Sequence, residues 1–288
     1  MQKSNPTKKI FPKQPQNRPG LEYKMTPEPE YEALTPGSNK LENKKCVITG
    51  GDSGIGRAVA IAFAKEGADV AIIYLKEDKD AEITAKIIRE KYKRECILIP
   101  ADISKERQCI SAIKKANKTF KHIDVLVNNA AVQFPKKKIT EITSEQLTHT
   151  FAVNIFAMFW LTKETLQHMK AGSCIINTTS VTAYRGSPEL LDYSSTKGAI
   201  VSFTRSLAAN LADKKIRVNG VAPGPIWTPL IPSTFKNVKA QTFGTETPLK
   251  RPGQPSEVAP CFVFLASADA QYMTGQVLHP NGGEIVNG

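Results

Sequence analysis

The chain has 288 residues, of which 41% are hydrophobic and 23% charged, and no stretch approaches the ~20 apolar residues of a membrane helix. These values predict a globular chain of one large or two small domains with no membrane partner. The net charge of +12 admits nucleic acid or an anionic small molecule as a partner, but the basic residues are spread out and no nucleic-acid motif accompanies them, so we expect no nucleic acid. Five cysteines without a CxxC pair predict free thiols in a reducing cytoplasm, and we expect no metal.

The first segment, residues 1–41, differs in composition from the rest. It is rich in Pro, Lys, Gln and Asn, lacks the apolar region of a secretory signal, and contains prolines that disfavour helix interiors and sheet ladders. We predict an extended arm without a core of its own, followed by one domain over 42–288. Two interpretations stay open: a disordered tail, or an arm that packs on its own domain or a neighbouring subunit through Ile10, Phe11, Leu21, Tyr23, Met25, Tyr31 and Leu34.

From residue 42 onward, short apolar runs alternate with longer amphipathic stretches. Helical spacing is clear over 56–68 and 197–214. Several of the short runs are apolar on both faces, as in strands buried between two helix layers. The alternation predicts a single α/β domain with a doubly wound parallel sheet, whose strands we expect at 45–50, 69–75, 96–102, 124–130, 173–180, 216–224 and 275–283.

The first strand runs into the glycine-rich stretch TGGDSGIGRA, residues 49–58, which then opens a helix. Glycines at 50, 54 and 56 permit a tight turn and let backbone N–H groups approach a pyrophosphate, while the helix directs its positive end at that anion. A tight turn without a ligand is the alternative. The position after the first strand favours a dinucleotide site.

The end of the second strand bears on the form of the dinucleotide. An acid there binds the ribose 2′-hydroxyl of NAD, whereas an arginine accommodates the 2′-phosphate of NADP. The strand ends in Ile73-Tyr74-Leu75-Lys76-Glu77, and we identify neither an acid where the strand stops nor a following arginine. Tyr74 is placed to contact the ribose or adenine, and Arg57 and Lys76 remain candidate phosphate partners. The sequence therefore favours NAD and leaves NADP open.

Four polar residues form a candidate catalytic set. Ser180 follows the fifth strand, where ligands of parallel sheets bind, and Tyr193 and Lys197 share a helix face one turn apart. A phenol beside an ammonium, whose charge lowers the phenol pKa, suits proton transfer to the alkoxide that hydride transfer creates. Ser180 is expected to hold the substrate oxygen, and Asn154 to hold a water that links Lys197 to solvent.

With these residues in place, the chain resembles the short-chain dehydrogenase/reductase family. TGGDSGIG matches its TGxxxGxG loop, NNAA (128–131) resembles its NNAG stretch with Ala131 in place of glycine, and PGPIWT (223–228) fits its PGxxxT segment. Residues 154, 180, 193 and 197 fall on its catalytic tetrad. The resemblance covers roughly 42–288 and implies a Rossmann fold, an NAD(P) cofactor, an alcohol or carbonyl substrate and a homotetramer. Within the family, the chain is similar in particular to bacterial stress-type and glucose-dehydrogenase-like oxidoreductases with a Pro-rich N-terminal arm.

The resemblance also implies cofactor contacts, position by position. Gly50, Ser53, Ile55 and Gly56 are expected at the pyrophosphate and adjacent ribose, and Asp102 and Ile103 at the adenine. Asn129, Ala130 and Ala131 are expected beneath the adenine-side ribose, and Lys197 at the nicotinamide ribose. The carboxamide is expected to be framed by Pro223, Gly224, Ile226 and Thr228.

The segments around the substrate are less specific. Residues 230–248 are expected to form a mobile lid, with an ordinary surface loop as the alternative. The four histidines lack metal-ligand spacing and are expected at surface or packing positions. Substrate-pocket candidates are Gln133, Phe134, Arg185, Gly186, Ser187, Leu190 and Trp227.

The leading functional hypothesis is an NAD(P)-dependent oxidoreductase that acts on a hydroxyl or carbonyl group. The runner-up is a dinucleotide sensor or scaffold without catalysis, since a fold alone does not fix a function. A nucleic-acid-binding role ranks third.

Overall fold

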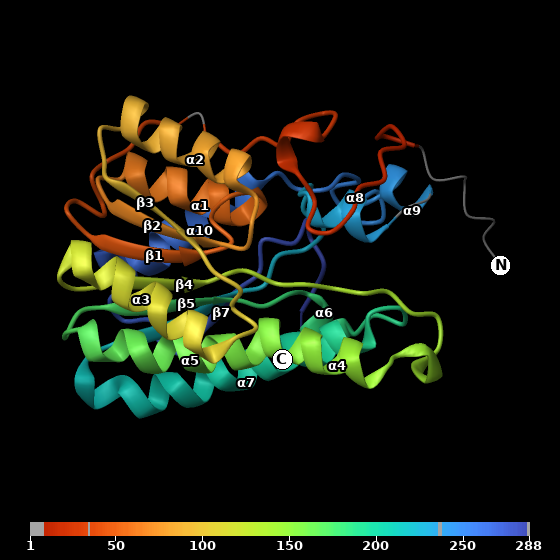
Figure 1. The fold of residues 1–288 in the computed structure, drawn as a ribbon. Helices are drawn as coiled ribbons and strands as arrows, with labels where there is room; N and C mark the ends of the chain where they lie inside the picture. The colour runs from red at the N-terminus through yellow and green to blue at the C-terminus, as the bar shows by residue number, and fades with distance from the viewer. Residues whose placement is uncertain (1–8, 34, 236–237, 287–288) are drawn as a thin grey trace.

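The structure is a computed structural model that describes residues 9–33, 35–235 and 238–286. In this part of the chain, seven parallel strands form one sheet in the order β3-β2-β1-β4-β5-β6-β7, which confirms the predicted doubly wound α/β fold (Figure 1). The strands are β1 (Lys45–Thr49), β2 (Asp69–Tyr74), β3 (Cys96–Pro100), β4 (Val125–Asn128), β5 (Cys174–Thr178), β6 (Arg217–Val221) and β7 (Val277–Leu278).

Helices cover both faces of the sheet (Figure 1). One layer contains α1 (Gly54–Lys65), α2 (Asp78–Lys91) and α10 (Pro255–Ala266), and the other α3 (Glu106–Phe120), α5 (Ala157–Thr165) and α7 (Leu191–Leu211). The remaining helices are shorter: α4 (Ser144–Phe151), α6 (Thr182–Arg185), α8 (Leu230–Thr234), α9 (Val238–Gln241), a π-helical turn η3 (Ala152–Phe156), and the 3₁₀ turns η1 (Glu22–Lys24), η2 (Ile139–Glu141), η4 (Leu166–His168), η5 (Ala212–Lys214) and η6 (Ala268–Ala270).

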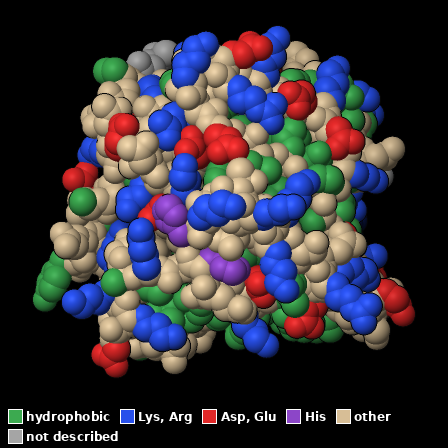
Figure 2. All heavy atoms as spheres, turned by 60° about the vertical axis from the view of Figure 1, so that its left-hand side comes forward, with side chains coloured by type: hydrophobic (Ala, Val, Ile, Leu, Met, Phe, Trp, Pro, Cys, Tyr) green, Lys and Arg blue, Asp and Glu red, His purple; other side chains and the backbone are tan. Residues whose placement is uncertain are grey.

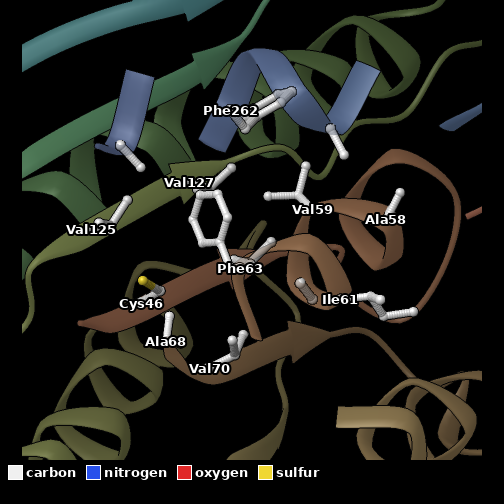
Figure 3. Close-up of a cluster of buried hydrophobic side chains, with 14 of the residues drawn as sticks. Cys46, Ala58, Val59, Ile61, Phe63, Ala68, Val70, Val125, Val127 and Phe262 are labelled. Atoms are coloured by element: carbon white, nitrogen blue, oxygen red, sulfur yellow. The ribbon is translucent and has the colours of Figure 1, made fainter. Parts of the chain in front are cut away.

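Alternate residues of each central strand enter opposite core layers. Cys46 and Ile48 of β1 pack in the layer of α1 and α10, whereas Val47 between them packs in the layer of α3 and α5. In the first layer, Phe63 of α1 and Phe262 of α10 are fully buried over the sheet (Figure 3). Burial on both faces explains the continuous apolar runs of the sequence, because each such side chain gains about 1.5–3 kcal/mol on leaving water.

Several strands end before the predicted positions. The expected strand at 275–283 is two residues long, and the polar stretches after β3, β5 and β6 leave the sheet as loops. These loops form the edge at which the carboxyl ends of the strands meet.

Among the described residues all five cysteines are free thiols, four of them buried.

The described part of the arm packs on its own domain. The Phe11 ring stacks on Trp227, with centroids 3.6 Å apart, and Met25 is buried. Of the other expected anchors, Ile10 and Tyr23 are exposed, and Leu34 lies outside the described residues. In Figure 1 the arm runs beside α8 and α9.

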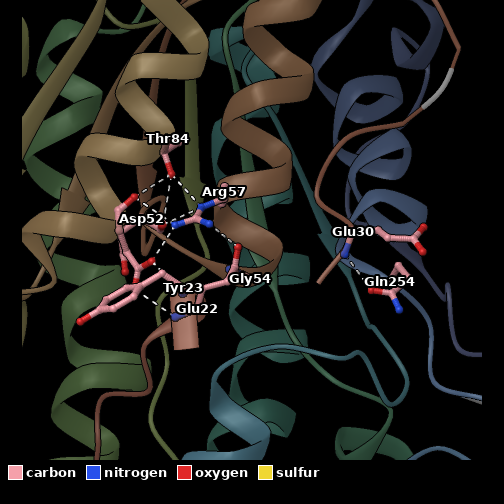
Figure 4. Close-up of polar contacts among 9 residues, drawn as sticks. Glu22, Tyr23, Glu30, Asp52, Gly54, Arg57, Thr84 and Gln254 are labelled. Carbon is pink, nitrogen blue, oxygen red and sulfur yellow. Dashed lines mark hydrogen bonds and ion pairs between the residues drawn. The ribbon is translucent and has the colours of Figure 1, made fainter. Parts of the chain in front are cut away.

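The most deeply buried polar contact of the arm is made by an acidic side chain, which the sequence analysis did not expect as an anchor. The fully buried Glu22 carboxylate accepts hydrogen bonds from the Arg57 guanidinium, at 2.6 Å, and from the backbone N–H of Gly54 (Figure 4). Arg57, also fully buried, pairs with Asp80 at 3.0 Å and donates to Thr84. We call Glu22, Arg57 and Asp80 the buried ion cluster; it joins the arm to the glycine-rich loop and to α2.

The surface carries its charge in dispersed form on the face that lies to the left in Figure 1. Figure 2 shows Lys and Arg side chains scattered among acids over this face, without a continuous basic patch. Every helix among the described residues is too short or too polar to span a lipid bilayer.

Removal of the Glu22 carboxylate is expected to destabilise the protein strongly. Glu22→Ala leaves the Arg57 charge and the Gly54 N–H short of a buried partner, and such losses cost about 3–5 kcal/mol. Denaturant unfolding measures the change in the free energy of unfolding. The control is Glu30→Ala, whose side chain is exposed on the same arm and is expected to change stability by about 0.5 kcal/mol or less. Equal losses in the two variants would contradict the role of the cluster.

Candidate active site

A cleft of about 880 Å³ opens at the carboxyl ends of the strands, within the range of ~300–1,000 Å³ typical of ligand pockets. Its walls come from the glycine-rich loop, the ends of β2 and β4, the segment after β5 and the start of α7. The sheet places these segments together because all its strands point the same way. Most of the predicted site residues line this cleft.

The glycine-rich loop presents backbone to the cleft. Gly50, Ser53 and Ile55 line it, and α1 begins at Gly54 with its positive end there. Gly56 is not among the residues that line the cleft, and its expected contact with the pyrophosphate stays a prediction. A Cβ atom at this position would lie 1.9 Å from the Gly50 carbonyl oxygen, so the glycine permits close packing of helix against loop.

The other expected cofactor residues line the cleft as a continuous strip. They are Tyr74, Asp102, Ile103, Asn129, Ala130, Ala131, Lys197, Pro223, Gly224, Ile226 and Thr228. With its backbone-rich loop, its helix terminus and this strip of residues, the cleft suits an elongated dinucleotide with a pyrophosphate at its centre.

Two acids of the cleft were given no role in the sequence analysis. Asp52 of the glycine-rich loop and Glu77, at the start of α2, both line the cleft and are more than nine-tenths buried. Burial raises the pKa of Asp52 to about 6, and the Glu77 charge adds to the rise. Glu77 follows Gly56 by about 20 residues, the separation at which dinucleotide sites carry their ribose-binding acid. That spacing was the available signal.

Arg57 is not free to bind a 2′-phosphate. Its guanidinium donates to Glu22, Asp80, Thr84 and the Asp52 carbonyl oxygen, and it does not line the cleft. Of the two candidate phosphate partners, only Lys76 reaches the cleft.

Three of the four predicted catalytic residues share one wall. Ser180 lies two residues beyond β5, and Tyr193 and Lys197 lie one turn apart in α7; all three are more than nine-tenths buried. The Ser180 hydroxyl accepts hydrogen bonds from the Thr182 N–H and hydroxyl, both at 3.1 Å. Its remaining hydrogen is therefore available to the Tyr193 oxygen, with which it interacts. Thr182, which also lines the cleft, was not foreseen.

Burial dominates the ionisation of the pair. It raises the pKa of Tyr193 to about 12, with the hydrogen bond from Ser180 acting in the opposite direction. Burial also lowers the pKa of Lys197 to about 7, because the loss of water disfavours the charged amine. The amine donates to the Thr178 carbonyl oxygen, at 2.8 Å, and lies 5.3 Å from the centroid of the Tyr193 ring. Desolvation therefore shifts the Tyr193 pKa upward, in the direction opposite to the effect expected from the nearby amine.

Asn154 lies behind this wall rather than in it. It is fully buried in the π-helical turn η3. Its side-chain amide accepts a hydrogen bond from the Val132 N–H and donates one to the Val132 carbonyl oxygen. Its Nδ2 also donates to Thr196, whose hydroxyl donates to the Tyr193 carbonyl oxygen. Asn154 therefore joins the end of β4 to the catalytic helix.

The substrate-side candidates divide into two groups. Five line the cleft: Gln133, Phe134, Arg185, Ser187 and Leu190. Gly186 and Trp227 do not. Trp227 is fully buried beneath Phe11 and donates to the Pro27 carbonyl oxygen, so it anchors the arm. His149, which we expected at a surface or packing position, and Arg18, which was not singled out, also line the cleft.

The expected lid contains the short helices α8 and α9. Pro232 and Gln241 of this segment accept backbone hydrogen bonds from arm residues Gln16, Ile10 and Phe11. Leu230, Ile231, Ser233, Phe235 and Phe243 line the cleft. The arm is thus hydrogen-bonded to the segment that lines the substrate side of the cleft.

Comparison with known proteins identifies the family. A family model described as Enoyl-(Acyl carrier protein) reductase matches residues 50–284. An uncharacterized oxidoreductase of Bacillus subtilis, YhxC, is 54% identical over 99% of this chain and 100% of its own length. The chain belongs to the short-chain dehydrogenase/reductase family. It is therefore an NAD(P)-dependent oxidoreductase.

Two further members are informative about cofactors. The NADPH-dependent aldehyde reductase 1, chloroplastic, of Arabidopsis thaliana is 53% identical over 94% of this chain and 96% of its own. A short-chain dehydrogenase from Burkholderia cenocepacia, solved in complex with NADP, superposes with a TM-score of 0.80 at 28% identity, over 85% of this chain and 98% of its own.

Proposed function

We propose that this short-chain dehydrogenase/reductase transfers hydride between NAD(H) and a small alcohol or aldehyde, with Tyr193 as the general acid and base. The observation that carries the proposal is the grouping of Ser180, Tyr193 and Lys197 on one wall, beside the strip of cofactor residues. A relative named for aldehyde reduction supports the substrate class.

The residues of the wall divide the work. Ser180, held by Thr182, orients the substrate oxygen by donating its single hydroxyl hydrogen to that oxygen in place of the Tyr193 oxygen. In reduction, Tyr193 gives its hydroxyl proton to the oxygen as the carbonyl carbon gains hydride; in oxidation it takes that proton back. The bound nicotinamide supplies or accepts the hydride. When protonated, Lys197 stabilises the phenolate that remains on Tyr193, and its pKa of about 7 allows it to exchange a proton near neutrality.

Tyr193→Phe tests the mechanism. The variant keeps the ring and loses only the proton donor, so kcat is expected to fall by about 10²–10⁴-fold, the usual contribution of general acid–base catalysis. Steady-state kinetics with a panel of small aldehydes measures the loss, and NADH titration verifies that cofactor binding is retained. Undiminished turnover in the variant would exclude this role for Tyr193.

We further propose that the adenosine end of the cleft selects NAD(H) over NADP(H). Asp52 and Glu77 both line it, and a 2′-phosphate beside two carboxylates suffers like-charge repulsion. Similar structures have been solved with either cofactor: the Burkholderia cenocepacia short-chain dehydrogenase with NADP, and a 3-ketoacyl-(acyl-carrier-protein) reductase from Brucella melitensis with NADH. The two acids favour NAD for this chain.

Parallel fluorescence titrations with NADH and NADPH test this selection. NADH is expected to bind at least about tenfold more tightly at pH 8, a difference of about 1.4 kcal/mol. The preference is expected to weaken below pH 6, because Asp52, with a pKa of about 6, takes up a proton and loses its charge. Glu77→Gln should lower the Kd for NADPH, whereas Glu82→Gln, an exposed acid paired with Arg89, should not. Tighter NADPH binding by the wild type would point to Lys76 as a phosphate partner.

We also propose a homotetramer, as the family resemblance implies. Leu147, Phe156 and Phe159 are exposed on α4, η3 and α5, and Phe159 lies against Phe203 of α7, with ring centroids 4.5 Å apart. A second copy of the chain fits an aromatic surface of this kind.

Sedimentation is expected to give a tetramer for the wild type and a smaller species for Phe159→Glu, because a charge on the apolar surface opposes association. A monomeric wild type would exclude the assembly.

A further inference from the structure

Arg18, on the N-terminal arm, enters the substrate side of the cleft. Its guanidinium carbon lies 4.5 Å from the centre of the Phe134 ring, and both residues line the cleft. An arginine stacked on an aromatic ring keeps its N–H donors free at the edge of its plane. Arg18 is an exposed residue by its total accessible surface. Partial burial of its guanidinium nevertheless lowers the pKa of that group.

Among the described residues, Arg18 lacks a carboxylate partner, in contrast to the other arginines of the cleft and its surroundings. Arg57 is paired with Glu22 and Asp80, and Arg185 with Glu284 at 3.1 Å. A partly desolvated guanidinium with free donors favours a bound anion, since planar oxyanions match its paired N–H groups.

The arm holds Arg18 in place from both sides. Before it, the Gln16 N–H donates to the Pro232 carbonyl oxygen. After it, Gly20 packs so closely on Pro229 that a Cβ atom would lie 2.3 Å from the Pro229 carbonyl oxygen. Glu22 then fixes the arm in the buried ion cluster. A residue fixed this way loses little entropy when it binds a ligand.

Contacts also connect the Arg18 position to the catalytic wall. The Phe134 carbonyl oxygen accepts a hydrogen bond from Gln146, which also donates to Asp192, the residue before Tyr193. Gln146 therefore links the backbone of Phe134, the residue on which Arg18 stacks, to the start of the helix that carries Tyr193.

We propose that Arg18 is a specificity-determining residue that binds a carboxylate or phosphate group of the substrate. The preferred substrates are then small aldehydes or alcohols that carry such an anionic group. The inference deepens the proposed function and rests on it, because it names the substrate class of the same site.

Ligand binding to the full-length protein loaded with NADH tests the proposal without requiring turnover. The probes are butyrate for a carboxylate, glycerol 3-phosphate for a phosphate, and glycerol as the neutral reference, each titrated by calorimetry. The wild type is expected to bind at least one anionic probe about tenfold or more tightly than glycerol. Comparison of the two anions tells which group the site takes.

Arg18→Gln is expected to weaken the preferred anion about 10- to 100-fold, the loss typical of a charge-assisted bidentate contact, and to leave glycerol and NADH unchanged. Arg18→Lys keeps the charge but not the planar donor pair, so its affinity for the preferred anion is expected to lie between those of the wild type and Arg18→Gln. The matched control is Lys13→Gln, which removes one positive charge from an exposed arm position and should change nothing.

Equal binding of anionic probes by Arg18→Gln and the wild type would overturn the proposal, as would an equal loss for glycerol. With reactive substrates, KM for succinic semialdehyde or glyceraldehyde 3-phosphate should rise in Arg18→Gln while kcat and the KM for butanal stay near their wild-type values. Turnover of butanal without any preference for the charged aldehydes would overturn the Arg18 assignment and leave the oxidoreductase function standing. Anion binding without turnover of any aldehyde or alcohol would overturn the oxidoreductase function and leave Arg18 standing as an anion-binding residue.

Discussion

The buried ion cluster of Glu22, Arg57 and Asp80 is the interaction on which the arrangement of the cleft depends. A guanidinium removed from water costs several kcal/mol unless its donors are satisfied, and here two carboxylates, a hydroxyl and backbone oxygens satisfy them. The partners come from the arm, the glycine-rich loop and α2, and Glu22 also accepts from the first N–H of α1. The cluster therefore fixes the glycine-rich loop and the path of the arm together.

Much of the fold could be predicted because its signals are local. Strands buried on both faces need continuous apolar runs, and the loop after β1 needs glycines wherever backbone passes close to backbone, as at Gly56. The wall of Ser180, Tyr193 and Lys197 followed from a strand end and a helical repeat. Strand ends were less predictable, since the polar residues beyond β5 and β6 differ from strand residues only in where the neighbouring strand stops pairing.

The role of the arm could not be predicted because its contacts join residues far apart in the chain. Glu22 meets Arg57 across 35 positions and Phe11 meets Trp227 across more than 200, with no periodicity to signal either pairing. One signal was present: Arg57 lies on α1 within an almost wholly apolar run, so its charge required a buried acid from elsewhere. Trp227 was mistaken for a pocket residue because a large aromatic beside a cofactor loop suits either role.

The cleft that results is electrically uneven. Asp52 and Glu77 give one end negative charge, whereas Lys197 and Arg18 give the catalytic and substrate side positive or readily protonated groups. Electrostatic complementarity works by penalising the wrong partner as well as attracting the right one. The acids would select against a phosphate on the cofactor ribose, and Arg18 would select for an anionic group on the substrate. Because the two selections use different side chains, a variant at either end should change one specificity and leave the other in place.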